Sequence, residues 1–283
     1  MKTTKKRKKI TFQRIAIHIA AWLAGLVWIV PFMGILMASV RPQKELLYGW
    51  WHFEEFHLSL TNFISAWNHA TAPIGQGLRN SLFVAVPATI LPLVIAPMFA
   101  YGLLRLRFPG RKILMVGVVL LLSIPQQMVA IPLFQTLVDF GIINSLFGLI
   151  ITHTAWGLIW ITIFMRNYLT TLPPELEEAA SLDGASSLQI FFKIVLPLSL
   201  PGLASVAALQ FTWVWNDFFM ALITIYEPDL LVATQRVPLL KGQYDIDWGL
   251  ISAASLIVTA IPLLVFIFLQ KYYIKGLIGW TSK

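Results

Sequence analysis

Long apolar stretches recur along this chain and alternate with short polar segments. A helix that crosses the hydrocarbon core of a bilayer needs about 20 consecutive, mostly apolar residues. The fold class that we expect is therefore all-α, that of a polytopic membrane protein with both termini on one side. Six stretches predict spanning helices, at approximately Ile15–Met37, Asn80–Leu104, Ile113–Val138, Leu146–Arg166, Leu200–Tyr226 and Trp248–Gln270.

Lys and Arg residues are distributed unevenly between the two sides that this topology creates. One set of loops and tails holds sixteen of the 21 basic residues, and the opposite set holds five. Basic residues concentrate in cytoplasmic loops, so we expect the richer side, with both termini, to be cytoplasmic. The formal net charge of +8 is thus explained by membrane orientation and by anionic lipid, and it gives no reason to expect nucleic acid as a partner.

Composition also favours a membrane protein and excludes several kinds of site. Of the 283 residues, 58% are hydrophobic and 12% are charged, whereas soluble domains average roughly 45–50% and about 25%. The chain contains no cysteine, which excludes disulfides, thiolate metal sites and cysteine nucleophiles. The start MKTTKKRKK is followed by an apolar stretch without a small-residue cleavage site. We therefore interpret residues 1–14 as a basic cytoplasmic tail and not as a signal peptide.

Prolines inside the predicted spans indicate kinked helices. Each proline removes a backbone hydrogen bond, and in a bilayer such breaks persist where neighbouring helices or a water-filled cavity satisfy the freed carbonyls. A kink that only improves packing stays an alternative for any single proline, but together they favour a bundle around a pathway that changes shape. The six prolines are Pro87, Pro92, Pro97, Pro125, Pro132 and Pro262.

The stretch ELEEAASLDGASSLQIFFKIVLPLSLPG, residues 175–202, is a polar cytoplasmic loop between the fourth and fifth predicted spans. It predicts two short helices. We expect Thr170 or Thr171 to cap the first helix, whose first turn carries acidic residues that complement the positive end of the helix dipole. Gly184 is expected to end this helix in the left-handed conformation.

The second helix of this loop is expected over Leu188–Leu196, with Ser186 or Ser187 as its cap and Pro197 as its end. Its apolar side chains would hold the loop against its own membrane domain. These side chains are Phe191, Phe192, Ile194 and Val195.

One face of the first helix is small and shallow. It carries Leu176, Ala179, Ala180 and Asp183, which lie three or four residues apart. The residues alone leave two interpretations open. The loop is either an interfacial helix–turn–helix resting on lipid headgroups or a docking surface for a cytoplasmic partner.

The spacing of this loop resembles the EAA loop of ABC importer permeases, in the version found in carbohydrate-type permeases. Other blocks of that family occur in the same order: RNSLFVAVPATI, AYGLLRLRFPGRK, IPQQMVAIPLFQTLVDFGIINS and FTWVWNDFF, so that the resemblance runs from about residue 60 to residue 270. The C-terminal tail KYYIKGLIGWTSK resembles the family only loosely. The residues that carry the loop pattern are Glu178, Ala179, Ala180, Asp183, Gly184, Ile194, Leu196 and Pro197.

The resemblance implies a type I ABC importer permease fold. It divides the chain into a transmembrane domain, 15–270, which contains the EAA loop, 171–197, and a cytoplasmic tail, 271–283. The EAA loop would dock on an ATPase subunit through polar contacts of Glu178 and Asp183, through close approach at Ala179 and Ala180, and through a turn at Gly184.

The resemblance also implies partners. They are a second permease subunit in a heterodimer, two ATPase subunits that carry ATP and Mg, an extracellular substrate-binding protein, and membrane lipid. Because the chain contains no G-x-x-x-x-G-K-[ST] phosphate loop, the nucleotide would bind to another polypeptide, and we expect no cofactor, catalytic residue or metal site on this chain.

Asn216 and Asp217 lie inside the predicted fifth span, four residues or fewer after Trp213. Exposing an ionised residue to lipid costs about 2.5–3.5 kcal/mol on insertion scales, so Asp217 is expected to face the bundle, a partner or water. An aromatic face beside carboxylate and amide groups is suited to binding a sugar, and these three residues are our candidates for the substrate pathway. Hydrogen bonding between helices is the alternative, and it is the preferred interpretation of His153 in the fourth span.

The function that these observations predict is that of the permease subunit of an ATP-driven, binding-protein-dependent sugar importer in the inner membrane of a bacterium or archaeon. A self-contained secondary carrier is the alternative. It would need coupling-ion carboxylates near the midplane and often an internal repeat, whereas the chain offers one carboxylate there. An integral membrane enzyme is disfavoured because neither H-E-x-x-H nor G-x-S-x-G occurs.

Overall fold

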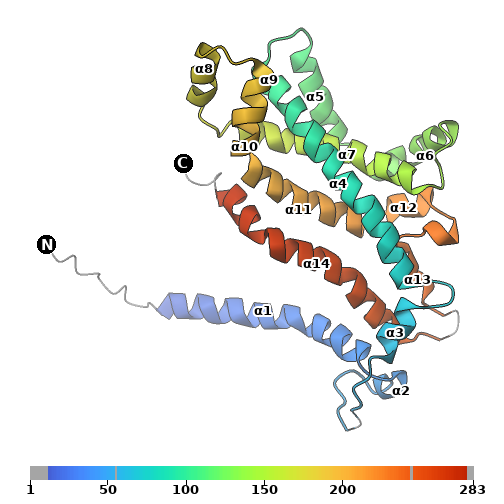
Figure 1. The fold of residues 1–283 in the computed structure, drawn as a ribbon. Helices are drawn as coiled ribbons and strands as arrows, with labels where there is room; N and C mark the ends of the chain where they lie inside the picture. Colours follow the sequence, from blue (N-terminus) through green and yellow to red (C-terminus); the bar gives the residue numbers. More distant parts are fainter. Residues whose placement is uncertain (1–11, 55, 243–244, 279–283) are drawn as a thin grey trace. The chain divides into compact units, whose positions relative to one another are not determined.

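Helices dominate the computed structural model of the chain, which describes residues 12–54, 56–242 and 245–278 (Figure 1). In chain order the elements are α1 (Phe12–Ser39), α2 (Gln43–Leu46), α3 (Thr61–Trp67), α4 (Ile74–Arg105), α5 (Arg111–Leu122), η1 (Gln126–Val129), α6 (Ala130–Asp139), α7 (Leu146–Leu169), α8 (Glu175–Leu182), α9 (Ser187–Ile190), η2 (Phe191–Val195), α10 (Leu196–Leu198), α11 (Leu200–Asn216), α12 (Phe219–Thr224), η3 (Pro228–Leu230), α13 (Ala233–Leu239) and α14 (Trp248–Ile278). Here η1 and η3 are 3₁₀-helices and η2 is a π-helix.

Four of these helices, α1, α4, α7 and α14, are each long and apolar enough to cross a membrane. Two bent pairs also qualify if each is counted as one span. Residues 111–122 and 126–139 meet at 99°, and residues 187–198 and 200–216 meet at 71°. The described part of the chain thus has four to six candidate spans, and the all-α prediction is confirmed.

The third predicted span is bent at Pro125, which has an extended backbone between α5 and η1. Proline lacks an N–H group and disfavours helical geometry in the residue before it, so a helix that enters this point ends there. The prolines of α4 and Pro262 of α14, in contrast, lie within helices that continue past them.

The fifth predicted span, Leu200–Tyr226, is wrong as a single helix. Helix α11 ends at Asn216, Asp217 has an extended backbone with φ −67° and ψ 128°, and α12 begins at Phe219. Apolar residues lie on both sides of Asn216 and Asp217, so the mean hydropathy of the stretch did not reveal the break.

Contacts within the chain divide it into two units. One comprises residues 1–66 and 241–256, and the other comprises residues 67–240 and 257–283. The predicted tails fall largely outside the description: residues 1–11 and 279–283 are not described, and the predicted boundary at residue 270 lies inside α14.

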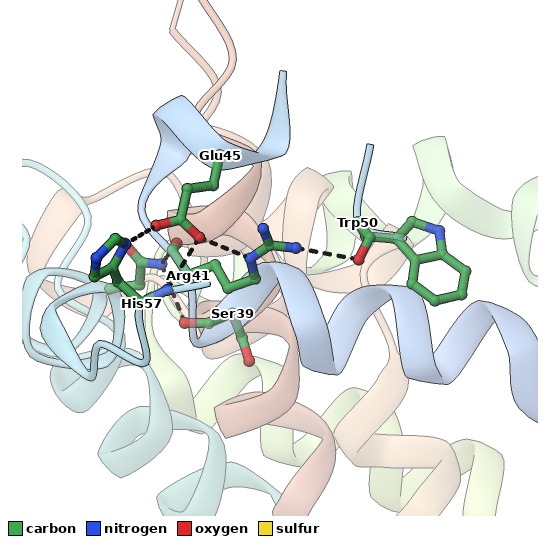
Figure 2. Close-up of polar contacts among 6 residues, drawn as sticks. Ser39, Arg41, Glu45, Trp50 and His57 are labelled. Carbon is green, nitrogen blue, oxygen red and sulfur yellow. Dashed lines mark hydrogen bonds and ion pairs between the residues drawn. The ribbon is translucent and has the colours of Figure 1, made fainter. Parts of the chain in front are cut away.

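In the first unit, a polar cluster around the buried Arg41 holds the segment that follows α1 (Figure 2). The side chain of Arg41 is fully buried, and its Nε donates to Glu45 Oε2 at 2.9 Å while its Nη1 donates to the Trp50 carbonyl at 3.2 Å. His57 Nδ1 lies 2.8 Å from Glu45 Oε1, and the His57 backbone N–H donates to Glu45 Oε2. We call Arg41, Glu45, Trp50 and His57 the Arg41 cluster.

Electrostatics favour the ionised form of Glu45 in this cluster. Burial works against that form, but the hydrogen bonds from Arg41 and His57 and the charge of Arg41 outweigh it, so the pKa of the Glu45 carboxyl lies below its ordinary value. The Arg41 guanidinium also lies over the rings of Phe53 and Phe56, at 5.8 and 5.3 Å from their centroids.

The core of the second unit lies where α4, α7, α9, η2 and α11 meet. Its side chains are mostly aliphatic or aromatic, and the pair Tyr101 and Phe191 is in ring contact with centroids 5.3 Å apart. This core joins the polar loop to the spanning helices. Its members are Ala96, Ala100, Tyr101, Ile161, Met165, Leu169, Ile190, Phe191, Val195 and Val206.

Candidate functional site

Helix α8 and the segments after it form the EAA loop that the sequence predicted. The N-cap position of α8 is Pro174, and it supplies no side-chain cap. The prediction that Thr170 or Thr171 caps this helix is wrong. Their hydroxyls donate to the carbonyls of Asn167 and Tyr168, both at 2.7 Å, and so terminate α7.

The turn between the two helices of the loop is as predicted. Gly184 has φ +83°, which favours glycine over other residues. Ser186 caps the next helix, because its hydroxyl accepts from the Gln189 backbone N–H while the Gln189 side chain accepts from the Ser186 N–H. These two contacts fix the direction in which the chain leaves the turn.

The second helix differs from its prediction in shape and length. It starts at Ser187, passes through the π-helical turn η2 and continues past Pro197 to Leu198. Proline at 197 clashes with the carbonyl four residues earlier, and the wider π turn before it relieves that crowding. Phe191 and Val195 are buried as expected, but Phe192 is 51% exposed and does not fasten the loop to the core.

The predicted docking residues fall on two sides of the loop. Glu178, Ala179, Asp183 and Gly184 are exposed, whereas Ala180 is half-buried against the core described above. Ile194 and Leu196 are also half-buried, while Pro197 is exposed. The surface available to a partner is therefore narrower than the face predicted from the helix periodicity.

This exposed surface also carries an apolar side chain that the sequence analysis did not single out. Leu182, at the end of α8, is 90% exposed. A leucine exposed to this degree at the tip of a short helix is suited to insertion into a partner's groove.

An ion pair joins α8 to the end of α4. Arg105, the last residue of α4, donates from Nε to both Glu177 carboxylate oxygens, at 3.0 and 3.1 Å, and from Nη2 to Oε1 at 2.7 Å. The two side chains are 27% and 13% exposed. The sequence predicts only a helix-dipole role for the acidic residues in the first turn of α8, because nothing local shows that a residue 72 positions before Glu177 lies beside it.

A cavity of about 580 Å³ lies beside the break between α11 and α12. It brings together the three residues predicted for the substrate pathway, Trp213, Asn216 and Asp217. The lining is mixed aromatic, amide and aliphatic. The residues around it are Gln126, Gln127, Trp160, Leu209, Thr212, Trp213, Asn216, Asp217, Phe218 and Phe219.

A buried glutamine positions Trp160 in the wall of this cavity. Gln210 accepts from Trp160 Nε1 at 2.7 Å and donates to the carbonyl of Ala88 in α4 at 3.0 Å. Trp160 lies against Trp213, with ring centroids 6.2 Å apart. Gly157 leaves room for this arrangement, because a Cβ there would meet the Gln210 amide at 2.6 Å.

Asp217 has partners on three segments. Its Oδ2 accepts from the Ala221 N–H at 3.2 Å, its carbonyl accepts from the Thr234 hydroxyl at 2.8 Å, and its carboxylate lies 3.7 Å from His153 Nε2. The side chains of Asp217 and His153 are 7% and 3% exposed. The fourth span offered no ionisable partner for His153, and the fifth span supplies one.

With this geometry in view, comparison with known proteins identifies the family. Residues 88–278 match the family described as "Binding-protein-dependent transport system inner membrane component". The chain belongs to this family. It is thus a membrane component of a binding-protein-dependent transport system, as the resemblance of the EAA loop predicted.

Curated relatives agree over most of the chain. It is 54% identical over 264 residues to a probable ABC transporter permease protein of Pyrococcus horikoshii, which covers 93% of this chain and 96% of that protein. It is 38% identical over 283 residues to an osmoprotective compounds uptake permease protein of Synechocystis sp., with 98% and 95% covered. An alpha-glucoside transport system permease protein of Rhizobium meliloti is 41% identical over 220 residues, 76% of this chain and 58% of that protein.

A solved structure supports the fold. A chain of a bacterial ABC transporter involved in the import of the acidic polysaccharide alginate superposes with a TM-score of 0.78 at 23% identity, covering 93% of this chain and 99% of that chain. The type I importer permease fold is therefore confirmed.

Proposed function

We propose that this permease forms the translocation pathway of an ATP-driven sugar importer and that a separate ATPase subunit docks on the exposed face of its EAA loop. The observation that supports this proposal most directly is the form of that loop. It presents an exposed helix tip and a glycine turn to a partner, while Phe191 and Val195 fasten its other side into the core of the spanning helices. A self-contained carrier has no need of such a unit.

The proposed assembly extends the family description, which mentions a binding protein and an inner membrane component. It comprises this permease, a second permease subunit, two ATPase subunits with ATP and Mg, and an extracellular binding protein. Both termini and the EAA loop are on the cytoplasmic side, as the distribution of basic residues favours. Catalysis of ATP hydrolysis belongs to the ATPase subunits, and this chain has no catalytic residue of its own.

Sugar as the substrate is supported by the cavity and by one relative, whose printed name specifies alpha-glucosides. In the cavity, Trp160 and Trp213 offer ring faces, and Asn216 and Asp217 offer hydrogen-bonding groups. The Gln126 amide nitrogen is buried and has no hydrogen-bond partner among the described residues, so it is available to a hydroxyl of the substrate or to water.

Transport by the reconstituted complex tests this proposal. The permease, its partner subunits and its binding protein are placed in proteoliposomes and offered ¹⁴C-labelled maltose, trehalose and glycine betaine. We expect ATP-dependent uptake of a sugar. ATP-dependent uptake of glycine betaine alone would overturn the substrate class, and uptake by this chain alone along an ion gradient would overturn the importer proposal.

A substitution in the EAA loop tests the docking face separately. Glu178→Lys reverses a charge on the exposed side of α8, and we expect the amount of ATPase that co-purifies to fall about tenfold, because a desolvated like-charge contact costs several kcal/mol. Glu54→Lys makes the same charge change in the first unit and should leave co-purification unchanged. Unchanged co-purification in both variants would remove Glu178 from the docking surface.

A further inference from the structure

The pair Arg105–Glu177 differs from an ordinary surface ion pair. Exposed pairs contribute about 0–1 kcal/mol because they are solvated and hold two flexible side chains in place. Here the guanidinium meets the carboxylate through three hydrogen bonds of 2.7–3.1 Å, and both side chains are largely withdrawn from solvent. A bidentate pair of this kind fixes direction as well as distance.

Helix α8 has few other attachments to the spanning helices. All eight of its residues are described, and none of them is buried. Ala180 packs against the core, and among the described residues Arg105–Glu177 is the one ion pair that links α8 to another helix. The orientation of α8 relative to α4 therefore depends strongly on this pair.

Besides the packing of Ala180, two connections lead from α8 into the membrane domain. The chain itself continues through α9, η2 and α10 into α11, with a 71° bend before α11. The ion pair leads instead to α4, which packs along α7 and α11. Through the Ala88 carbonyl, α4 also holds Gln210, and Gln210 holds Trp160 of the cavity wall.

We propose that Arg105 and Glu177 are positioning residues for coupling. The pair makes α4 move together with α8, so a displacement that a nucleotide-binding partner imposes on α8 reaches the helix that supports the cavity wall. Without the pair, α8 is still connected to α11 through the chain and to the core through the packing of Ala180, but its direct ionic link to α4 is lost. This inference rests on the proposed function, because it requires an ATPase on the EAA loop.

A reporter in the cavity tests the proposal without knowledge of the substrate. The chain has no cysteine, so Thr212→Cys places a single thiol on the cavity lining. Its rate of reaction with a water-soluble maleimide is measured in the assembled transporter, without nucleotide and with ATP and vanadate. We expect the two rates to differ by at least about threefold, since a change between two states alters the exposure of the lining.

In this background, Arg105→Glu and Glu177→Arg should each remove the nucleotide effect while the ATPase still co-purifies. The exchanged pair Arg105→Glu with Glu177→Arg should restore at least about half of the nucleotide effect. Restoration is expected to be incomplete because the reversed charges oppose the dipoles of both helices. Glu175→Arg makes the same charge change in the same turn of α8 and should leave the effect intact.

The outcomes separate this inference from the proposed function. If the parent chain shows no nucleotide effect although the ATPase is bound, the proposed function fails. If the parent responds and the single charge reversals respond equally, the role of the pair is overturned. If a single variant does not accumulate, the exchanged pair decides: restoration supports the inference, and an accumulated double variant without a nucleotide effect contradicts it.

Discussion

Two arginine–glutamate pairs in this permease differ in the sequence separation of their members and, we infer, in their roles. In the first unit, Arg41 and Glu45 are four residues apart and close a single segment, together with His57 (Figure 2). In the second unit, Arg105 and Glu177 are 72 residues apart and join the end of α4 to the first turn of α8. A local pair gives one segment a fixed shape, whereas a long-range pair makes two helices move as one.

Burial distinguishes the two pairs as well. Arg41 is fully buried and also lies over two aromatic rings, and the side chain of Glu45 is only 6% exposed, so little water can solvate either group if the pair opens. Arg105 and Glu177 keep some exposure, 27% and 13%, so water can solvate either group if the pair opens. We expect the Arg41 cluster to keep one arrangement during transport, and we expect the Arg105–Glu177 pair to transmit the movement of α8 to α4.

Removing the buried arginine should have the largest effect. Arg41→Met leaves the Glu45 carboxylate buried without its cation, and breaking a buried pair in this way is strongly destabilising. We expect hydrogen exchange of residues 41–60 to rise by at least about 100-fold in mass-spectrometric measurements. The nucleotide effect at Thr212→Cys should be unchanged, and its loss would erase the distinction between the two pairs.

The glycine turn should respond next. A side chain at Gly184 would meet no atom within 4 Å, so the cost of substitution is conformational. Gly184→Val forces a β-branched residue into the left-handed region at roughly 1–2 kcal/mol, and we expect ATPase co-purification to fall about tenfold. Gly184→Asn, which tolerates this conformation, is the matched variant and should retain most of it. Equal losses in both variants would point to contact with the partner and not to backbone strain.

Arginine-to-lysine exchange at both pairs sharpens the comparison further. Lysine keeps the charge but loses the planar donor fork. Because Arg41 also donates a hydrogen bond to the Trp50 carbonyl, Arg41→Lys should increase the hydrogen exchange of residues 41–60 by about tenfold. Arg105→Lys should reduce the nucleotide effect at Thr212→Cys by no more than about half. If Arg41→Lys left the exchange unchanged while Arg105→Lys abolished the nucleotide effect, the Arg105–Glu177 pair would be the one that depends more on the exact geometry of its arginine.

Acid should destabilise the Arg41 cluster, and among these predictions we expect this effect on hydrogen exchange to be the smallest. The pKa of Glu45 is lower in the folded chain than its ordinary value of 4.5, so its ionisation stabilises the fold above pH 4.5, and this stabilisation is lost as pH falls through the lower, folded value. Exchange of residues 41–60, corrected for the intrinsic rate, should rise below pH 4.5. Glu45→Gln should show high exchange with little pH dependence. A parent chain without this rise would contradict the role of the carboxylate.

Features set by neighbouring residues could be predicted from the sequence. Four of the six apolar spans, the Gly184 turn and the cap at Ser186, one of the two serines proposed for it, each depend on a few adjacent side chains, and these predictions are confirmed. The division of the chain into a domain and two tails stays a prediction. The residues Trp213, Asn216 and Asp217 were predicted to lie within one spanning helix, and the structure brings them to one cavity although Asp217 is outside the helix.

Features set by distant residues could not be predicted in this way. The Arg105–Glu177 pair, the contacts of Gln210 and the approach of His153 to Asp217 join helices whose packing no local pattern specifies. Thr170 and Thr171 had suitable chemistry for a cap, yet two prolines follow them, and their hydroxyls bond backward to α7. A short polar side chain offers several such partners, and tertiary context selects among them.

The central claim, that α8 is the contact between this permease and a separate ATPase, can be tested by cross-linking at one position. Leu182→Cys creates a single thiol on the 90% exposed tip of α8 in a chain without cysteine, and Tyr48→Cys, on a 73% exposed side chain of the first unit, is its control. With benzophenone-4-maleimide, whose maleimide reacts with the new thiol and whose benzophenone inserts on illumination into a C–H bond of any adjacent chain, the account predicts that Leu182→Cys becomes linked to the ATPase subunit and that Tyr48→Cys does not. An intact, ATP-hydrolysing complex in which Leu182→Cys forms no such link would contradict it.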